Sequence, residues 1–209
     1  MSREFDYQGF YDRIAPLYEL GQELIPVWRR YTEAVLPWLP PDGSVLEVGP
    51  GPGLLLEKLS RRHPFAVGLD LSWGMLRQAQ ERLRRAGLPA HLVQGDVTRL
   101  PFQEGAFQGI ATTFAFSAVP DGRTAMQEMA RVLAPGGILA LVDAGIPRDG
   151  NPGGVFLAHL WERFGDFLRD EAALMEEAGL QVIQRREFGV FNHIHLAVGR
   201  KPSPTSQSA

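Results

Sequence analysis

The chain has 209 residues and a formal net charge of −3, which allows one sizeable hydrophobic core and gives no global attraction to nucleic acid or anionic membranes. It contains no cysteine, so disulfides, thiolate metal sites and cysteine nucleophiles are excluded. No apolar run approaches the roughly 18 residues that a membrane-spanning helix requires, and we expect a cytoplasmic protein.

The segment 1–40 is expected to be a helical lid or substrate-binding segment. Apolar residues recur there at helical spacing in two stretches, 10–18 and 24–38. The second stretch also carries a pair of arginines, and it could either lie on a membrane interface or pack on the protein as a lid. Residues 41–200 are expected to form the main domain, and the polar tail 201–209 is expected to be disordered.

Strands and helices alternate along the main domain. Apolar runs predict strands at residues 44–48, 65–69, 90–94, 107–114 and 138–142, followed by two β runs at 181–188 and 193–198 that a short turn joins. Helical spacing predicts helices at residues 54–62, 73–86, 123–133 and 170–178, whereas 145–165 is expected to be irregular. The pattern predicts a Rossmann-like α/β fold: a seven-stranded, mostly parallel sheet with helices on both faces and an antiparallel C-terminal hairpin.

The stretch from Val45 to Gly53 is the most informative part of the sequence. An apolar strand interrupted by Glu47 leads into glycines at alternate positions, Gly49, Gly51 and Gly53. Glycine permits positive φ angles and lets a ligand approach the backbone without a Cβ in the way. The G-x-G-x-G spacing differs from the G-x-G-x-x-G that seats a pyrophosphate, and it favours a nucleoside ligand without a phosphate bridge.

Acidic residues stand at the ends of the next two predicted strands. Because ligands of open α/β sheets bind at the carboxyl ends of the strands, these residues are expected to face the same ligand. Asp70 can accept both hydroxyls of a ribose, and Asp96 can accept from an exocyclic amine. Val97 can pack on one purine face, with Leu71 and Met75 on the other. Together these side chains predict an adenosine site.

In combination the motifs resemble the class I S-adenosylmethionine-dependent methyltransferases. The resemblance is strongest to the branch that holds the ubiquinone/menaquinone C-methylases and the phospholipid N-methyltransferases, with a methyltransferase type 11 domain. The residues that carry it are 45–53, 67–76, 94–102 and 131–139, together with the opening stretch 10–18.

The resemblance implies S-adenosyl-L-methionine as the cofactor and assigns residues to it. Gly49, Gly51 and Gly53 would approach the methionine moiety, Asp70 would hold the ribose, and Asp96 with Val97 would meet the adenine. The remaining residues expected at the cofactor are Glu47, Leu71, Met75, Phe114, and Tyr11, which together with Tyr18 would close over it. For the two tyrosines, a place in the core on one helix face is the open alternative.

Catalytic residues are harder to predict, because the cofactor carries the reactivity and the protein supplies positioning and desolvation. Tyr18 and His159 are the candidates, with His159 as the base for an acceptor that must lose a proton. A surface or core position is the alternative for His159. Phe114 and Phe116, after the fourth strand, are expected to line an apolar pocket mouth, with core packing as the alternative.

We expect a methyltransferase for a small, apolar or amphipathic acceptor, with a quinone or a phospholipid head group favoured. No Asn/Asp-Pro-Pro-Tyr/Phe sequence follows the fourth strand, which argues against the nucleic-acid amino-methylating enzymes, and we expect neither a nucleic-acid partner nor a metal ion. Two alternatives stay open: a methyltransferase for an unrelated soluble metabolite, and a non-catalytic nucleoside-binding scaffold. Peripheral membrane contact through the N-terminal helices is a further expectation, and no oligomeric state is predicted.

Overall fold

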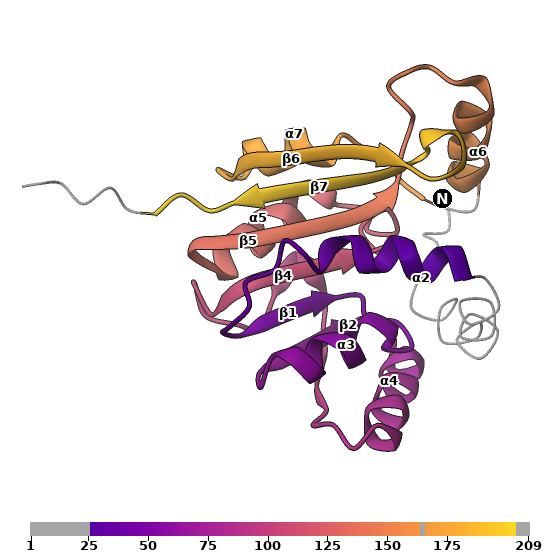
Figure 1. The fold of residues 1–209 in the computed structure, drawn as a ribbon. Coiled ribbons are helices and arrows are strands. Elements are labelled where there is room, and N and C mark those ends of the chain that lie inside the picture. The colour runs from indigo at the N-terminus through magenta and orange to yellow at the C-terminus, as the bar shows by residue number, and fades with distance from the viewer. Residues whose placement is uncertain (1–25, 164–165, 204–209) are drawn as a thin grey trace, which may run out of the picture.

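The computed structural model of the protein describes residues 26–163 and 166–203. These residues form one seven-stranded sheet with helices packed on it (Figure 1). The predicted N-terminal segment up to residue 25, including Tyr11 and Tyr18, lies outside the described residues, and so does the end of the tail, 204–209.

The sheet has the predicted organisation. Its strands are β1 (Val45–Val48), β2 (Ala66–Asp70), β3 (His91–Gln94), β4 (Phe107–Thr113), β5 (Leu133–Ala144), β6 (Gln181–Phe188) and β7 (Ile194–Arg200). Their spatial order is β3-β2-β1-β4-β5-β7-β6. Strands β1 to β5 pair in parallel, whereas β7 is antiparallel to both β5 and β6. The mostly parallel sheet with an antiparallel C-terminal hairpin is therefore confirmed.

Helices cover both faces of the sheet, as predicted. They are α2 (Pro26–Thr32), α3 (Leu54–Arg62), α4 (Trp73–Arg85), α5 (Gly122–Val132), α6 (Pro152–Arg163) and α7 (Glu171–Glu177), with 3₁₀ turns η1 (Glu33–Val35), η2 (Val97–Arg99) and η3 (Val190–Asn192). One core cluster joins the sheet to α5 and α7, and the other joins its opposite face to η1 and α3. Because both faces are covered, every residue of β1 is buried, which explains the apolar side chains of Val45, Leu46 and Val48. Glu47 is the buried polar exception in this strand.

The prediction for residues 145–165 is wrong, because most of this segment is helix α6. Asn151 caps the helix, its side-chain oxygen accepting from the backbone N–H groups of Gly153 and Gly154 at 3.0 and 3.3 Å. Because glycine has a low helix propensity, these two glycines make the helix hard to predict from the sequence. Gly154 is needed for close packing, since a Cβ there would lie 2.3 Å from the carbonyl oxygen of Phe191.

Strand β5 begins earlier than predicted. The sequence predicts a helix over 123–133 and the next strand from 138, but the helix ends at Val132 and the run Pro135-Gly136-Gly137 lies inside β5. The pairing with β4 jumps from Leu133 to Ile138, so the run forms a bulge opposite Gln108. Gly136 has a φ of 78°, a conformation that glycine adopts without strain.

The strand order reverses between β1 and β4. From β1 the chain adds β2 and β3 on one side of the sheet, and β4 and β5 lie on the other side. In open α/β sheets this reversal leaves a crevice at the carboxyl ends of the two central strands. Among the described residues, no helix combines the length and apolarity needed to cross a membrane.

Candidate cofactor and acceptor site

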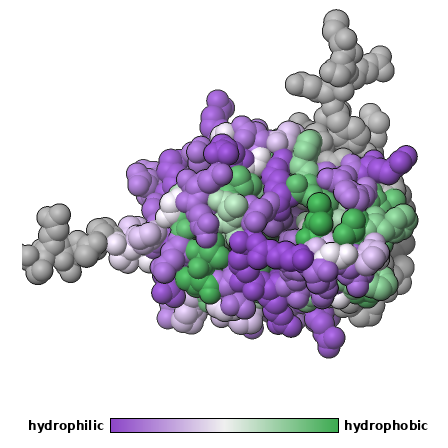
Figure 2. All heavy atoms as spheres, turned by 90° about the horizontal axis from the view of Figure 1, so that it is seen from above, coloured by the Kyte–Doolittle hydropathy of each residue, from purple (hydrophilic) through white to green (hydrophobic). Residues whose placement is uncertain are grey.

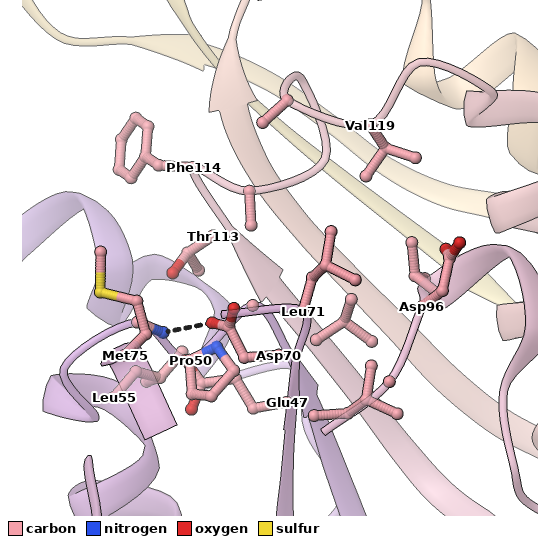
Figure 3. Close-up of a pocket in the computed structure, with 18 of the residues that line it drawn as sticks. Glu47, Pro50, Leu55, Asp70, Leu71, Met75, Asp96, Thr113, Phe114 and Val119 are labelled. Carbon is pink, nitrogen blue, oxygen red and sulfur yellow. Dashed lines mark hydrogen bonds between the residues drawn. The ribbon is translucent and has the colours of Figure 1, made fainter. Parts of the chain in front are cut away.

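A cavity of about 560 Å³ opens where the strand order reverses (Figure 3). It is bounded by the segments that follow β1, β2, β3 and β4, with one residue from α2. Its lining residues are Thr32, Glu47, Val48, Gly49, Pro50, Gly51, Leu54, Leu55, Leu69, Asp70, Leu71, Met75, Gly95, Asp96, Val97, Thr98, Thr113, Phe114, Ala115, Ala118, Val119, Pro120 and Asp121. The predicted cofactor residues Glu47, Gly49, Gly51, Asp70, Leu71, Met75, Asp96, Val97 and Phe114 are all among them. The fold thus brings them together around one space.

The glycine loop after β1 approaches the loop after β4 closely. Gly49 and Gly51 have φ angles of 68° and 52°. A Cβ on Gly49 would lie 2.3 Å from the Cβ of Ala115, so only glycine fits between the two loops. The bare backbone of the loop forms one end of the cavity.

Gly53 does not line the cavity, although the sequence predicts it there. It is the N-cap of α3, with a φ of 83°. A Cβ on Gly53 would lie 3.0 Å from Ala79 in α4. Its physical role in this structure is to let α3 and α4 pack closely, and its contact with the cofactor stays a prediction.

The carboxylate of Asp70 is held at the end of β2 by backbone donors. Its Oδ2 accepts from the N–H of Gly51 at 3.2 Å, and its Oδ1 accepts from the N–H of Ser72 at 2.9 Å. The first bond, drawn in Figure 3, ties the end of β2 to the glycine loop. The side chain is oriented before any ligand binds, which lowers the ordering cost of binding.

Glu47 is a buried carboxyl group at the base of the cavity. Only 1% of the residue is exposed, and its Oε2 has no hydrogen-bond partner among the described residues. Burial, and secondarily the charge of Asp70, raises the pKa of Glu47 to about 8. An unpaired buried carboxyl is costly unless a ligand supplies a partner.

The opposite end of the cavity combines one acid with apolar side chains. Asp96 caps η2, and its Oδ1 accepts from the N–H of Thr98 at 2.8 Å. Val97 and Met75 are buried, whereas Leu71 is partly exposed at the rim. A flat apolar ring could lie between these side chains with the Asp96 carboxylate at its edge.

Phe114 lies at the cavity and Phe116 does not. Phe114 has a φ of 52°, unusual for a residue with a side chain, and its N–H donates to the carbonyl oxygen of Val142 at 2.8 Å. Phe116 is buried in the core, with the guanidinium of Arg169 5.7 Å from its ring centre. The predicted aromatic mouth is thus correct for Phe114 and wrong for Phe116, which packs in the core.

The structure places His159, the predicted base, on the surface of the protein. It lies on α6, not in an irregular segment, and its side chain is 60% exposed, with Nδ1 2.7 Å from an oxygen of Glu162. It is absent from the cavity lining. The other predicted catalytic residue, Tyr18, and the predicted cofactor residue Tyr11 lie outside the described residues.

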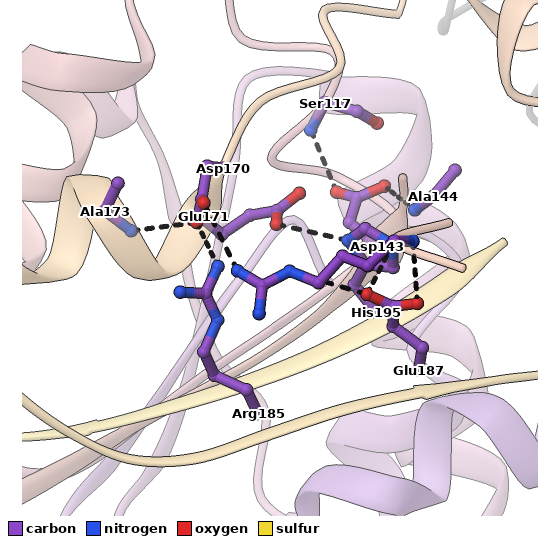
Figure 4. Close-up of polar contacts among 10 residues, drawn as sticks. Ser117, Asp143, Ala144, Asp170, Glu171, Ala173, Arg185, Glu187 and His195 are labelled. Carbon is purple, nitrogen blue, oxygen red and sulfur yellow. Dashed lines mark hydrogen bonds and ion pairs between the residues drawn. The ribbon is translucent and has the colours of Figure 1, made fainter. Parts of the chain in front are cut away.

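A second polar cluster lies behind the loop that follows β4 (Figure 4). Asp143, at the end of β5, is buried, and it accepts from the N–H groups of Ser117 and Ala144 at 2.9 and 2.8 Å. Burial raises the pKa of Asp143 to about 7. Nearby, His195 lies between Glu171 and Glu187, at 3.7 and 4.0 Å. Within this cluster, the bond from Ser117 to Asp143 ties the loop after β4 to the end of β5.

Residues 45–137 match a family model described as a methyltransferase domain. The chain is similar to the demethylmenaquinone methyltransferase of Mycobacterium marinum, 31% identical over 68% of this chain and 61% of the relative. It thus spans about three fifths of that relative's length. Similarity to the demethylmenaquinone methyltransferase of Thermus thermophilus is more extensive, 33% identical over 95% of this chain and 87% of the relative.

Solved structures agree on the fold. The methyltransferase in a complex with the Trm112 methyltransferase activator from Haloferax volcanii superposes with a TM-score of 0.75. It is 21% identical and the match covers 92% of this chain and 97% of that one. A structure from Thermotoga maritima described as an S-adenosylmethionine-dependent methyltransferase has a TM-score of 0.69 at 20% identity, over 93% of this chain and 99% of that one.

Proposed function

The chain belongs to the class I S-adenosylmethionine-dependent methyltransferases, in the branch of the quinone C-methylases, and from this premise we propose that it methylates a small amphipathic acceptor of the quinone type. The observation that carries the proposal is the convergence of the glycine loop, Glu47, Asp70 and Asp96 on one cavity. S-adenosylmethionine supplies an activated methyl group on a sulfonium centre when it is bound.

The residues of the cavity fit this cofactor. The unpartnered Oε2 of Glu47 would take a cationic hydrogen-bond donor, which the amino-acid end of the cofactor provides. Gly49 and Gly51 would allow that end to lie against the backbone. We assign Asp70 to the ribose hydroxyls and Asp96 to the exocyclic amine of the adenine.

The chain's own contribution to the reaction would be positioning and exclusion of water. Val97 and Met75 are buried beside the predicted adenine position, and Phe114 lines the cavity at the end of β4. An apolar enclosure of this kind orients the reacting groups and keeps water from competing with the acceptor. No histidine lies among the described lining residues, and we assign no general base.

Apolar side chains outside the cavity favour an amphipathic acceptor. Ile146, Phe156, Leu160, Val190 and Phe191 are exposed large hydrophobic residues on the β5–α6 connection, α6 and η3. Hydrophobic side chains are visible at this end of the molecule in Figure 2. These elements lie at the carboxyl edge of the sheet, on which the cavity also opens, so an acceptor with an apolar tail would find contact surface there.

A methyl-transfer screen tests the proposal. Labelled S-adenosylmethionine would be offered with a demethylated naphthoquinol, phosphatidylethanolamine and a panel of small soluble amines and phenols. The proposal predicts transfer to the quinol, and transfer to phosphatidylethanolamine or to a soluble acceptor alone would contradict it. Binding of the cofactor without transfer to any acceptor would favour the scaffold alternative.

A further inference from the structure

The segment between β4 and α5 forms one wall of the cavity. Figure 3 draws Phe114 and Val119 on this wall, across the cavity from Glu47 and Asp70. At its start the wall is fixed to the sheet by the hydrogen bond from Phe114 N–H to Val142. Its later part, which includes Val119 and Pro120, needs other support to keep its position.

That support comes from a side chain about fifty residues further along the chain. The Nη2 of Arg169 donates to the carbonyl oxygens of Val119 and Pro120 at 2.6 and 2.7 Å, and Nη1 donates to that of Phe116 at 3.4 Å. One guanidinium thus binds three carbonyl oxygens of the wall. The planar fork of arginine can do this, whereas the single ammonium group of a lysine lacks the same reach and geometry.

The surroundings of Arg169 are shaped to hold its guanidinium. The group lies 5.0 Å from the ring centre of Phe167 and 5.7 Å from that of Phe116. A Cβ on Gly122 would lie 2.6 Å from Nη1, so the glycine at the start of α5 leaves the space that the guanidinium fills. Phe167 adds a backbone bond of 2.7 Å from its N–H to the carbonyl oxygen of Ser117.

We propose that Arg169 is a positioning residue of the cofactor cavity, which holds Val119 and Pro120 against the end of the cavity where Asp96 lies. This inference rests on the proposed function. Arg169 is not itself among the lining residues, so it acts through the wall and not by touching the ligand. Loss of the Arg169 side chain should therefore lower the affinity for every ligand that contains adenosine, including a ligand without an amino-acid end.

The test measures binding of S-adenosylhomocysteine and of 5′-methylthioadenosine, which lacks the amino-acid end, to Arg169→Gln and Arg169→Lys. We expect the glutamine variant to bind both ligands about tenfold more weakly, the loss of roughly one well-placed hydrogen-bonded contact. The lysine variant should retain part of the affinity. Glu47→Gln provides the contrast, because it should weaken S-adenosylhomocysteine and leave 5′-methylthioadenosine unchanged.

The matched control is Arg123→Gln. Arg123 is an exposed arginine on α5 whose guanidinium pairs with Glu177 of α7 at 2.7 Å. The Arg123→Gln variant should bind both ligands with the affinity of the wild type. Wild-type affinity in Arg169→Gln, an equal loss in Arg123→Gln, or a lysine variant that fails to fold would overturn the inference. Failure of the wild type to bind either ligand would instead contradict the proposed function.

Discussion

At the residue scale, Glu47 shows a conflict between folding and ligand binding. The Oε2 of its buried carboxyl group has no hydrogen-bond partner among the described residues, and burial, with the charge of Asp70, raises the pKa of Glu47 to about 8. Such a group weakens the free protein, because ionising it in a buried position is unfavourable. A ligand with a cationic donor would turn the same group into a favourable contact. We therefore expect that replacing Glu47 by glutamine raises the stability of the free protein and lowers its affinity for the cofactor.

The first prediction concerns the stability of the free protein. The pKa of Glu47 is higher when folded than its ordinary value of 4.5, so the folded state binds more protons between these two values. Its contribution to stability therefore falls as the pH rises from about 4.5 to about 8. Glu47→Gln removes this penalty, and at pH 8 it should raise the midpoint of thermal unfolding by about 2 °C or more. A lower midpoint for the variant at pH 8 would refute this account.

The second prediction concerns the pH dependence of cofactor binding. Below its pKa of about 8, Glu47 must lose a proton before it can pair with an ammonium group. The affinity for S-adenosylhomocysteine should therefore rise about tenfold between pH 6 and pH 7, as measured by calorimetry. In Glu47→Gln the affinity should be low and nearly constant over this range. An equal slope in both proteins would assign the pH dependence to another group.

At the element scale, predictions from sequence succeeded where local periodicity decides the structure. Helix α3 has the predicted bounds, because its apolar positions follow helical spacing between a glycine cap and an extended residue. Helix α6 could not be predicted from local periodicity, because Gly153 and Gly154 occupy its first turn. These glycines allow the helix to pack closely against Phe191 of η3. The role of Arg169 could not be predicted, since its contacts join segments that only the finished fold brings together.

The two readings of Gly53 can be separated by comparing glycine-to-alanine variants. Gly87→Ala isolates the backbone cost, because Gly87 has a φ of 67° and open space around it, and we expect a loss of about 1–2 kcal/mol. Gly53→Ala adds a contact with Ala79 at 3.0 Å, which should destabilise the protein by about 1 kcal/mol more. Denaturant unfolding measures both.

Ligand binding gives the complementary readout. Folded Gly53→Ala should bind S-adenosylhomocysteine within about threefold of the wild type, a difference below 1 kcal/mol, because Gly53 is outside the cavity lining. If Gly53→Ala lost binding without losing stability, the result would support a direct contact between Gly53 and the cofactor.

At the scale of the whole molecule, the cavity and the exposed apolar side chains share the carboxyl edge of the sheet. The cavity lies at the reversal of strand order, and Ile146 is the second residue after the end of β5. The architecture could be predicted from the alternation of strands and helices, but the apolar surface could not, because it depends on which face of α6 remains uncovered. This arrangement suits an acceptor whose ring enters the cavity while its tail stays outside.

Variants of α6 test this arrangement. Phe156 is 68% exposed, and Leu160 lies one turn further along the helix. The double variant Phe156→Ser, Leu160→Ser should lower kcat/KM for a quinol with a long apolar tail about fivefold, which corresponds to ~1 kcal/mol of apolar contact. A short-tailed quinol should be unaffected. Phe65→Ser is the matched control, since Phe65 is 64% exposed at the amino-terminal edge of β2. Equal effects on both quinols would contradict a role in tail binding.

The most direct measurement is a calorimetric titration of the wild type and of Asp70→Ala with S-adenosylmethionine. The control is Asp149→Ala, which removes a carboxylate that also accepts a backbone N–H, from Asn151 at 2.9 Å, but lies outside the cavity. We predict one bound cofactor per chain for the wild type and the control, and at least about tenfold weaker binding for Asp70→Ala. Absence of binding to the wild type, or equal affinity in all three proteins, would contradict the assignment of this cavity to the methyl donor.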